Sequence, residues 1–230
     1  MSFIAYNQTD SLKYKRGYVG GNFSFAVNQM NFSGLRKYTY LLNQPPNYGG
    51  GMDIMLYAGV PDKIFATLSF NRLFQLNPQS GDYNKYALSV QYSYLALGIS
   101  ATVPIYHNLN NEVVKRVYYS IGVQSVAVDL SAKAIGNGAV GDTSFNYEDS
   151  EVKKIVLNTE VMFDLFSFGK NHKEYANDCV TLKIGYNFQF GHPWWSGTYY
   201  RNPGDENPNV NLGGFYVTIG INVWYLTQKK

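Results

Sequence analysis

The sequence predicts an all-β fold, an antiparallel up-and-down β-barrel whose strands cross a membrane. Apolar and polar residues alternate with a period of two in one segment after another, as expected for strands whose two faces meet different surroundings. Gly, Tyr and Phe number 22, 21 and 14 among 230 residues, a composition that favours strands over helices. A run of about 18 uncharged apolar residues, which a transmembrane helix needs, does not occur.

The segment 213–226, close to the C-terminus, shows the alternation most clearly. Its apolar residues take every second position, with small or polar residues such as Thr218 and Asn222 between them. Alternation over roughly a dozen residues is about twice the usual strand length of a soluble protein and matches a tilted strand that crosses a bilayer. We therefore expect this strand to close the barrel against the first one, with Trp224 and Tyr225 at a membrane interface.

The same alternation defines the other strands of an eight-stranded barrel. They are predicted at 17–30, 52–60, 64–71, 85–106, 117–130, 155–165 and 180–190. Segments rich in Gly, Pro, Asn or acidic residues predict long loops at 31–51, 77–82, 131–151 and 191–212. Because short turns separate the remaining strands, long loops lie at one rim and short turns at the other, as in an up-and-down barrel.

The segments 85–106 and 117–130 allow a second strand count. Their apolar residues change parity, at 94–95 in the first segment and at 123–126 in the second. A bulge inside one tall, kinked hairpin would explain both changes and would place residue 94 roughly opposite residue 124. Two tight turns would instead make ten strands. We favour the hairpin, because no Gly, Pro, Asn or Asp lies at the first change, and we expect it to protrude beyond the bilayer.

The N-terminus precedes the predicted barrel. Residues 1–16 are polar, and we expect them to form a segment ahead of a single barrel domain over residues 17–230. The first residues contain neither the basic region nor the apolar stretch of a signal peptide. Either the protein is not exported or its signal peptide has been removed, and a membrane barrel requires removal.

The polar faces of the predicted strands suit the inside of a small barrel. They carry Gly, Ser, Thr, Asn and Gln with few charges, whereas a water-exposed exterior would carry more Lys and Glu. The charged residues expected inside are Asp53, Glu160, Asp164 and Lys183. We expect Glu160, Asp164 and Lys183 to pair, because they lie on neighbouring strands and an unpaired buried charge is costly. A soluble barrel with its apolar face inside is the alternative.

Aromatic residues gather at both ends of the closing strand. The candidate contact residues in the loop before it are Trp194, Trp195, Tyr199 and Tyr200. Belts of Trp and Tyr at both interfaces are typical of membrane barrels. The alternative is that these aromatic residues are ordinary core residues of a β-sheet.

On these residues, the sequence resembles the small outer-membrane β-barrel proteins of Gram-negative bacteria. The resemblance covers about residues 17–226 and includes the Gly- and Tyr-rich strands, the segment 182–186 and the ending 214–226. The abundance of Tyr and Asn is most similar to barrels from the Bacteroidota. Many such barrels end in Phe or Trp, whereas here the polar residues 227–230 follow the strand. The resemblance implies a place in the outer membrane, in contact with its lipid.

Catalytic residues are not clustered in the sequence. His192 and Ser196, with Asp205 or Glu206 as the orienting acid, could form a Ser/His couple of the kind that outer-membrane acyl-transferring enzymes place near a rim. Their spacing matches no recognised motif, and a polar loop with aromatic anchors is the simpler interpretation. We therefore expect that the protein is not an enzyme.

Metal, cofactor and nucleic-acid binding are not expected either. The acidic residues of the segment 142–151 lack the regular spacing of a calcium-binding loop, and the glycines at 49–51 do not open a helix that would cradle phosphate. The net charge of +3 is too small and too spread to attract nucleic acid. Eight strands also leave too little room for an open pore.

These exclusions favour a structural or accessory role in the outer membrane. We expect a subunit of, or a docking partner in, an outer-membrane protein complex, with the long loops and the tall hairpin at 85–130 as contact surfaces. The alternatives are an outer-membrane enzyme that acts on lipid or peptide, and a narrow porin.

Overall fold

The computed structural model describes residues 17–29, 48–60, 63–76, 79–83, 86–107, 116–136, 145–167, 178–196 and 211–227. Eight antiparallel strands close into a barrel: β1 (Gly17–Gln29), β2 (Tyr48–Val60), β3 (Ile64–Gln75), β5 (Tyr86–His107), β6 (Arg116–Gly136), β7 (Phe145–Ser167), β8 (Cys179–Gln189) and β10 (Gly214–Thr227). Two short strands lie outside this ring: β4 (Gln79–Tyr83) pairs with β5, and β9 (Trp194–Ser196) pairs with β7. The predicted segment 1–16 lies outside the described residues.

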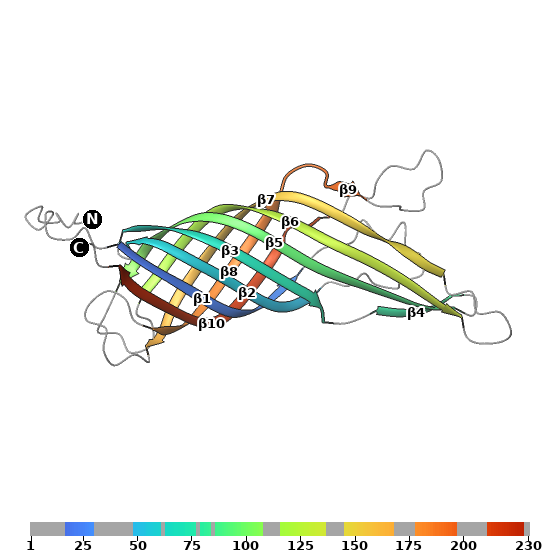
Figure 1. Cartoon of the computed structure of the whole chain (residues 1–230), viewed down its shortest axis with the longest axis horizontal. Coiled ribbons are helices and arrows are strands. Elements are labelled where there is room, and N and C mark those ends of the chain that lie inside the picture. Colours follow the sequence, from blue (N-terminus) through green and yellow to red (C-terminus); the bar gives the residue numbers. More distant parts are fainter. Residues whose placement is uncertain are drawn as a thin grey trace, which may run out of the picture.

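The first and last strands close the barrel. Gly17 lies opposite Thr227 and Asn28 opposite Tyr216, so β1 begins where β10 ends, and we call this end of the barrel the terminus end (Figure 1). The opposite end, where β1 ends and β2 begins, is the loop end. The ring follows chain order throughout, since β3 pairs directly with β5. The predicted up-and-down barrel of eight strands is therefore confirmed. None of the described residues forms a helix that could cross a membrane.

The tall hairpin is present, but without the predicted bulge. The register between β5 and β6 is unbroken from the pair Tyr86–Gly136 to the pair Pro104–Tyr118, and it shifts only beyond Pro104. Tyr94 lies opposite Val128, so the predictions of a bulge at 94–95 and of a partner near residue 124 are wrong. The ten-strand alternative is wrong for the same reason, because β5 is continuous through this region.

The change in pattern along β5 marks a change in surroundings and leaves the backbone regular. Tyr92, Tyr94 and Ala96 all point inward and are buried, whereas Leu95 and Leu97 between and beyond them are exposed. From Leu95 toward the terminus end, the outward side chains are apolar. On the other side of Leu95, the inward side chains are apolar. The apolar side chains move from the outward to the inward face because the strand leaves the bilayer at this level.

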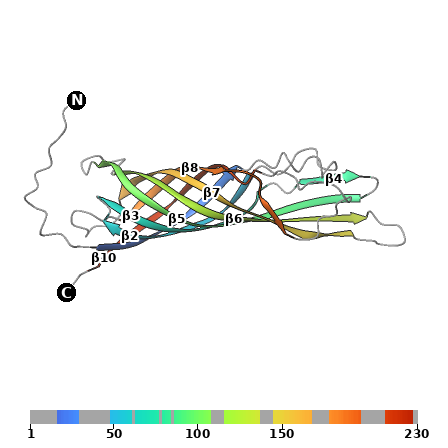
Figure 2. The same cartoon turned by 90° about the horizontal axis from the view of Figure 1, so that it is seen from above.

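Three strands continue beyond the rest of the barrel. Figures 1 and 2 show β5, β6 and β7 running past the other strands at the loop end. We call this part the upper sheet: residues 86–94 of β5, 126–136 of β6 and 145–155 of β7, flanked by β4 and β9. The remaining strand residues form the barrel body.

Several segments of the upper sheet were expected to be loops. The predictions for 77–82 and 131–151 are wrong where β4, the end of β6 and the start of β7 form, and β2 also begins inside the predicted loop 31–51. Outside the bilayer a strand has no lipid-facing side, so the apolar outward face that identifies it in the membrane is absent.

The barrel body turns its apolar side chains outward. On β10, Phe215 and Ile219 are exposed, whereas Thr218 and Asn222 are buried inside. Exposed aromatic residues mark both ends of the body, with Tyr48, Phe74, Phe188 and Phe190 at the loop end and Tyr106, Phe166 and Tyr225 at the terminus end. An apolar surface of this extent faces lipid.

One interface prediction fails. Trp224 points into the barrel and is only 1% exposed, whereas its neighbour Tyr225 is 65% exposed. Because successive side chains of a strand point to opposite faces, the pair Trp224–Tyr225 cannot mark the outer surface together. Trp224 instead contributes to the interior at the terminus end.

Candidate functional site

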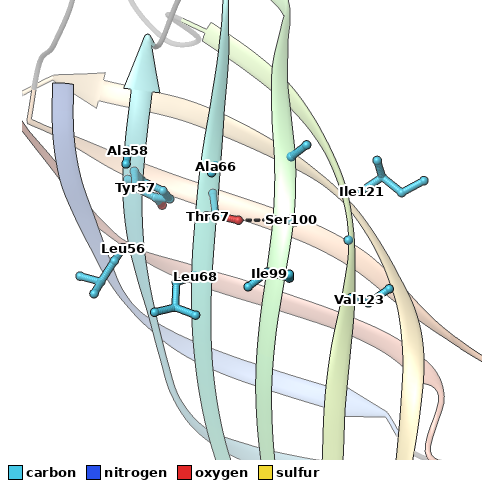
Figure 3. Close-up of a pocket in the computed structure, with 12 residues that line it drawn as sticks. Leu56, Tyr57, Ala58, Ala66, Thr67, Leu68, Ile99, Ser100, Ile121 and Val123 are labelled. Atoms are coloured by element: carbon cyan, nitrogen blue, oxygen red, sulfur yellow. Dashed lines mark hydrogen bonds between the residues drawn. The ribbon is translucent and has the colours of Figure 1, made fainter. Parts of the chain in front are cut away.

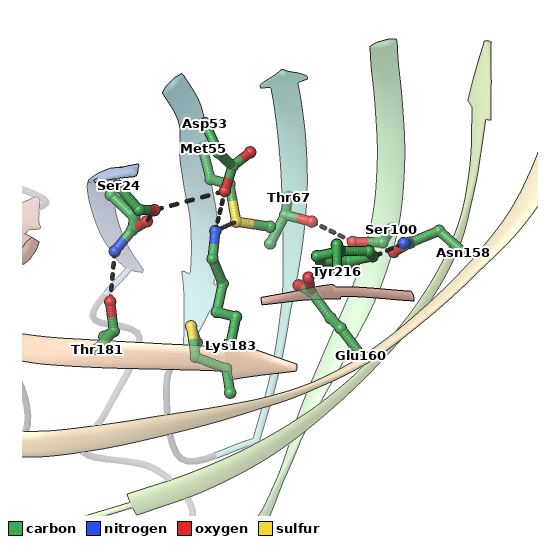
Figure 4. Close-up of polar contacts among 12 residues, drawn as sticks. Ser24, Asp53, Met55, Thr67, Ser100, Asn158, Glu160, Thr181, Lys183 and Tyr216 are labelled. Carbon is green, nitrogen blue, oxygen red and sulfur yellow. Dashed lines mark hydrogen bonds and ion pairs between the residues drawn. The ribbon is translucent and has the colours of Figure 1, made fainter. Parts of the chain in front are cut away.

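The interior of the barrel body holds a layer of polar side chains (Figure 4). Lys183 on β8 forms an ion pair with Asp53 on β2, and both side chains are buried. The Lys183 Nζ also lies 2.8 Å from the Sδ of Met55, and the Ser24 hydroxyl donates to Asp53 at 3.5 Å. Since β1 and β10 lie between β2 and β8 in the sheet, this ion pair spans the interior. Lys183 thus pairs with Asp53, and the expected pairing with its neighbours in the sheet does not form.

Glu160 belongs to a second group of contacts in the same layer. Its Oε2 accepts a hydrogen bond from the Tyr216 hydroxyl at 2.8 Å, and this hydroxyl accepts one from the Asn158 amide at 2.7 Å. The amide of Asn158 also donates to Asn187 at 2.8 Å. The ring of Tyr216 lies over Gly185, where an added Cβ would stand 2.3 Å from the Cζ of the ring. Gly185 therefore makes room for the contact between Tyr216 and Glu160.

Asp164 lies nearer the terminus end, beside Arg116. The two residues are opposite each other on β7 and β6, and they are 2% and 3% exposed. The amide of Asn222 donates to Asp164 at 3.4 Å. Arg116 was not among the predicted interior residues. Its parity with Tyr118 and Ser120 could have placed it inside, but it lies outside the predicted strand 117–130.

Apolar side chains fill the interior on both sides of the polar layer. Toward the terminus end, Tyr57 stacks on Trp224 with ring centroids 5.0 Å apart, and Phe65 meets Trp224 edge-on at 5.2 Å. Met55, Tyr118 and Met162 complete this cluster. Toward the loop end, Ala26, Leu73, Tyr94 and Ala96 belong to a second buried cluster. The described interior is therefore a packed core, as eight strands of this kind predict.

The second cluster continues into the upper sheet. The inward residues Tyr92, Val126, Val128 and Val152 are buried there together with Leu212 and with Val156 of the barrel body, and Trp195 of β9 packs against them. The outward face is polar. Ser93 donates to Asp129 at 3.3 Å, and Lys153 pairs with Glu151 at 2.6 Å. The upper sheet thus has an apolar inside and a polar outside, as a water-soluble β-sheet does.

The aromatic residues predicted to make loop contacts separate into two groups. Trp194 lies opposite Lys153 and is 60% exposed, whereas Trp195 lies opposite Val152 and faces the apolar cluster. The Nζ of Lys154 lies 5.1 Å above the ring of Trp194 and donates to the carbonyl of His192 at 2.7 Å. Tyr199 and Tyr200 lie outside the described residues.

The candidate Ser/His couple is only partly described. His192 is exposed, but the side chain of Ser196 and both candidate acids, Asp205 and Glu206, lie outside the described side chains. Within the described parts of the chain, no three His, Cys, Asp or Glu side chains gather as metal ligands. The described side chains therefore include no cluster from which a reaction could be derived.

A groove of about 600 Å³ crosses the outer surface of β2, β3, β5 and β6 (Figure 3). Its floor is a row of small residues, because Ala58 lies opposite Ala66 and Ala66 lies opposite Ala101. Larger apolar residues form one wall, namely Leu56, Leu68, Ile99 and Val123. The groove lies on the surface that faces lipid.

No protein-family model and no curated protein matches the sequence. Ail, the attachment invasion locus protein of Yersinia pestis, is similar in structure at 11% identity and a TM-score of 0.46, over 90% of this chain and 98% of that one. Neisserial surface protein A is similar at 11% identity and a TM-score of 0.40, over 90% of this chain and 96% of that one. CarO of Acinetobacter baumannii is similar at 12% identity and a TM-score of 0.43, over 90% of this chain and 97% of that one.

The membrane assignment rests on the chain's own features. These are an even number of antiparallel strands, both end strands meeting at the end opposite the two longest connections (30–47 and 190–213), an apolar outer surface with aromatic residues at both ends, and a polar interior layer. A closed barrel also leaves no unpaired strand edge in the lipid. Together these features identify the protein as an outer-membrane β-barrel.

Proposed function

We propose that the protein is a non-catalytic accessory component of the outer membrane that binds another protein through its upper sheet. The observation that carries this proposal is the extension of β5, β6 and β7 beyond the other strands, with an apolar core that continues from the loop end of the barrel body. A membrane anchor alone needs strands of about 9–11 residues, whereas β5, β6 and β7 have 22, 21 and 23 residues.

The filled interior supports a function at the surface. Buried clusters lie on both sides of the Lys183–Asp53 pair, so the described interior holds no path that would serve a porin. The outer surface of the barrel body is apolar and in contact with lipid. A partner in water would therefore meet the upper sheet first.

Trp194 is the residue of the upper sheet best suited to bind a partner. It is 60% exposed beside the exposed Lys153, and Trp is enriched among the residues that dominate protein interfaces. Its ring is held by Lys154, which lies above it and is itself fixed by the carbonyl of His192. A side chain held in place in this way loses little conformational freedom when a partner covers it.

The proposal is tested by co-purification from native membranes in mild detergent. The tagged protein is expected to bring down a stoichiometric partner, and Trp194→Ala is expected to reduce its recovery roughly tenfold or more, in line with interface hot spots. Tyr225→Ala is the matched control, because Tyr225 is an equally exposed aromatic residue at the other end of the barrel, at 65% against 60%. Recovery of the wild-type protein alone, or equal losses for both variants, would contradict the proposal.

We also propose, from composition, an origin in the Bacteroidota. The abundance of Tyr, at 21 residues, and of Asn supports this finer resemblance. A search of genomes from this group for barrels with the same long β5–β7 hairpins would test it, and finding them only elsewhere would count against it.

A further inference from the structure

Arg72 stands out on the outer surface of the barrel body. It lies on β3 between Phe70 and Phe74 on the same face, and it is exposed. Its partners on the neighbouring strands are Met52 and Leu95, which are also exposed and apolar. Among the described outward-facing strand residues of the barrel body, Arg72 is the one charged side chain.

A charge in this position needs a partner. An Arg side chain on the lipid-facing surface is strongly unfavourable at the middle of the bilayer and nearly neutral at the interface, where it reaches polar headgroups. None of the described carboxylates forms an ion pair with Arg72. Two other cations described near this end, Lys153 and Lys154, already have partners, which are Glu151 and the carbonyl of His192.

The guanidinium of Arg72 is directed toward the loop end. Its Cζ lies 5.2 Å from the centroid of the Phe74 ring, and Phe74 is two residues nearer the loop end on the same face. The ladder between β2 and β3 ends just beyond, where the amide of Leu76 donates to the carbonyl of Tyr48 at 3.1 Å. The side chain therefore extends along the barrel toward the bilayer surface and places its charge at headgroup level.

We propose that Arg72 binds a phosphate on the headgroup of a phosphorylated glycolipid in the outer leaflet. The loop end faces outward, because it carries the two longest connections, 30–47 and 190–213, and the long loops of such barrels are extracellular. A guanidinium offers a planar fork of N–H donors that matches phosphate, and the stacked ring of Phe74 keeps this fork in place. Charge complementarity thus selects the ligand, and the surrounding apolar surface accepts its acyl chains. This site lies in the barrel body and is independent of the upper sheet.

The test measures binding of diphosphoryl lipid A to the full-length protein in detergent micelles, by native mass spectrometry over a concentration series. Arg72→Gln is expected to weaken binding roughly tenfold, as for the loss of one charge-assisted contact. Arg72→Lys, which keeps the charge and loses the fork, should bind with intermediate affinity. Lys153→Gln removes the same charge from the upper sheet and should bind as the wild type does.

Two further probes identify the source of the phosphate. Lipid A without its phosphates should bind the wild-type protein as weakly as intact lipid A binds the Arg72→Gln variant, and phosphatidylglycerol should bind no better. Equal binding of intact lipid A to the wild type and to Arg72→Gln would overturn the site. Equal binding of lipid A and phosphatidylglycerol would overturn the assignment to the glycolipid. Heat-modifiable migration on gels verifies that each variant is folded.

Discussion

The barrel body and the upper sheet share β5, β6 and β7, and these strands have opposite polarity in the two regions. In the body, β5, β6 and β7 turn apolar side chains outward and enclose polar residues such as Ser120, Asn158 and Glu160. In the upper sheet, the same strands enclose Tyr92, Val128 and Val152 and turn polar residues outward. The direction of each side chain does not change along the strand. What changes is the solvent, from lipid to water.

This difference separates two ways of stabilising a β-sheet. Inside the body, hydrogen bonds and the ion pair between Lys183 and Asp53 join the strands in a polar layer that lies between two packed apolar clusters. In the upper sheet, burial of apolar side chains away from water does so, as in soluble proteins. An apolar substitution should therefore destabilise the polar layer of the body, whereas a polar substitution should destabilise the interior of the upper sheet.

The largest effect is expected from Lys183→Met, which leaves the carboxylate of Asp53 buried without its cation. The free energy of unfolding in detergent micelles should fall by about 3–5 kcal/mol, as measured by urea titration. The double variant Lys183→Met/Asp53→Leu should recover most of this loss, because it removes both charges. Lys153→Met, at an exposed ion pair, should change stability by less than about 1 kcal/mol. A small loss for Lys183→Met would show that the buried pair is not needed.

A polar substitution at an inward position should destabilise the upper sheet, although inward positions of the barrel body hold polar residues. Val128→Asn places an amide in the apolar cluster at a position that is 0% exposed, and it should destabilise the upper sheet by about 2–3 kcal/mol. Limited proteolysis in vesicles should then cleave the upper sheet faster, while heat-modifiable migration shows that the body remains folded. Asp129→Asn, on the exposed face of the upper sheet, is the control. Unfolding of the whole barrel in the Val128→Asn variant would show that the two regions are one cooperative unit.

A smaller effect is expected from Gly185→Ala in the polar layer. The new methyl group would meet the ring of Tyr216 and disturb its hydrogen bond to Glu160, at a cost of about 1–2 kcal/mol. Gly21→Ala is a matched control, because its Cβ would come no closer than 3.4 Å to any neighbour. If the steric explanation is right, the double variant Gly185→Ala/Tyr216→Ala should lose less stability than the two single variants added together. Full additivity would refute it.

The smallest effect is expected from Thr218→Val. The Thr218 hydroxyl is buried and has no hydrogen-bond partner among the described residues, so an apolar substitution of similar shape should be neutral or stabilising by less than about 1 kcal/mol. Thr181→Val is the contrasting variant, because the Thr181 hydroxyl accepts a hydrogen bond from Asn22 at 2.7 Å and its loss should cost about 1 kcal/mol. Urea titration would measure the change in the free energy of unfolding for both variants. The same response from both would mean that these hydrogen bonds contribute little.

The fold and the composition of the interior could be predicted from the sequence because lipid imposes a strict rule on each strand. One face must be apolar, so alternation alone identifies the strands and the residues that point inward. The rule fails beyond the bilayer, which is why the sequence predicts loops where β4 and parts of β6 and β7 form. It also fails for Arg116, which lies at the very start of its strand. Alternation carries no information about which inward residues meet.

The contacts between inward side chains depend on how the strands are arranged around the barrel. Lys183 lies on a strand next to that of Glu160, yet it pairs with Asp53, because closure brings β2 and β8 within reach across a narrow interior. Closure likewise places the ring of Tyr216 over Gly185, and the direction of Arg72 is visible only through its contact with Phe74. The polarity of the side chains along one strand is enough to show which face of that strand meets lipid, water or the barrel interior. Contacts between distant residues require the register and the closed ring, which no single strand encodes.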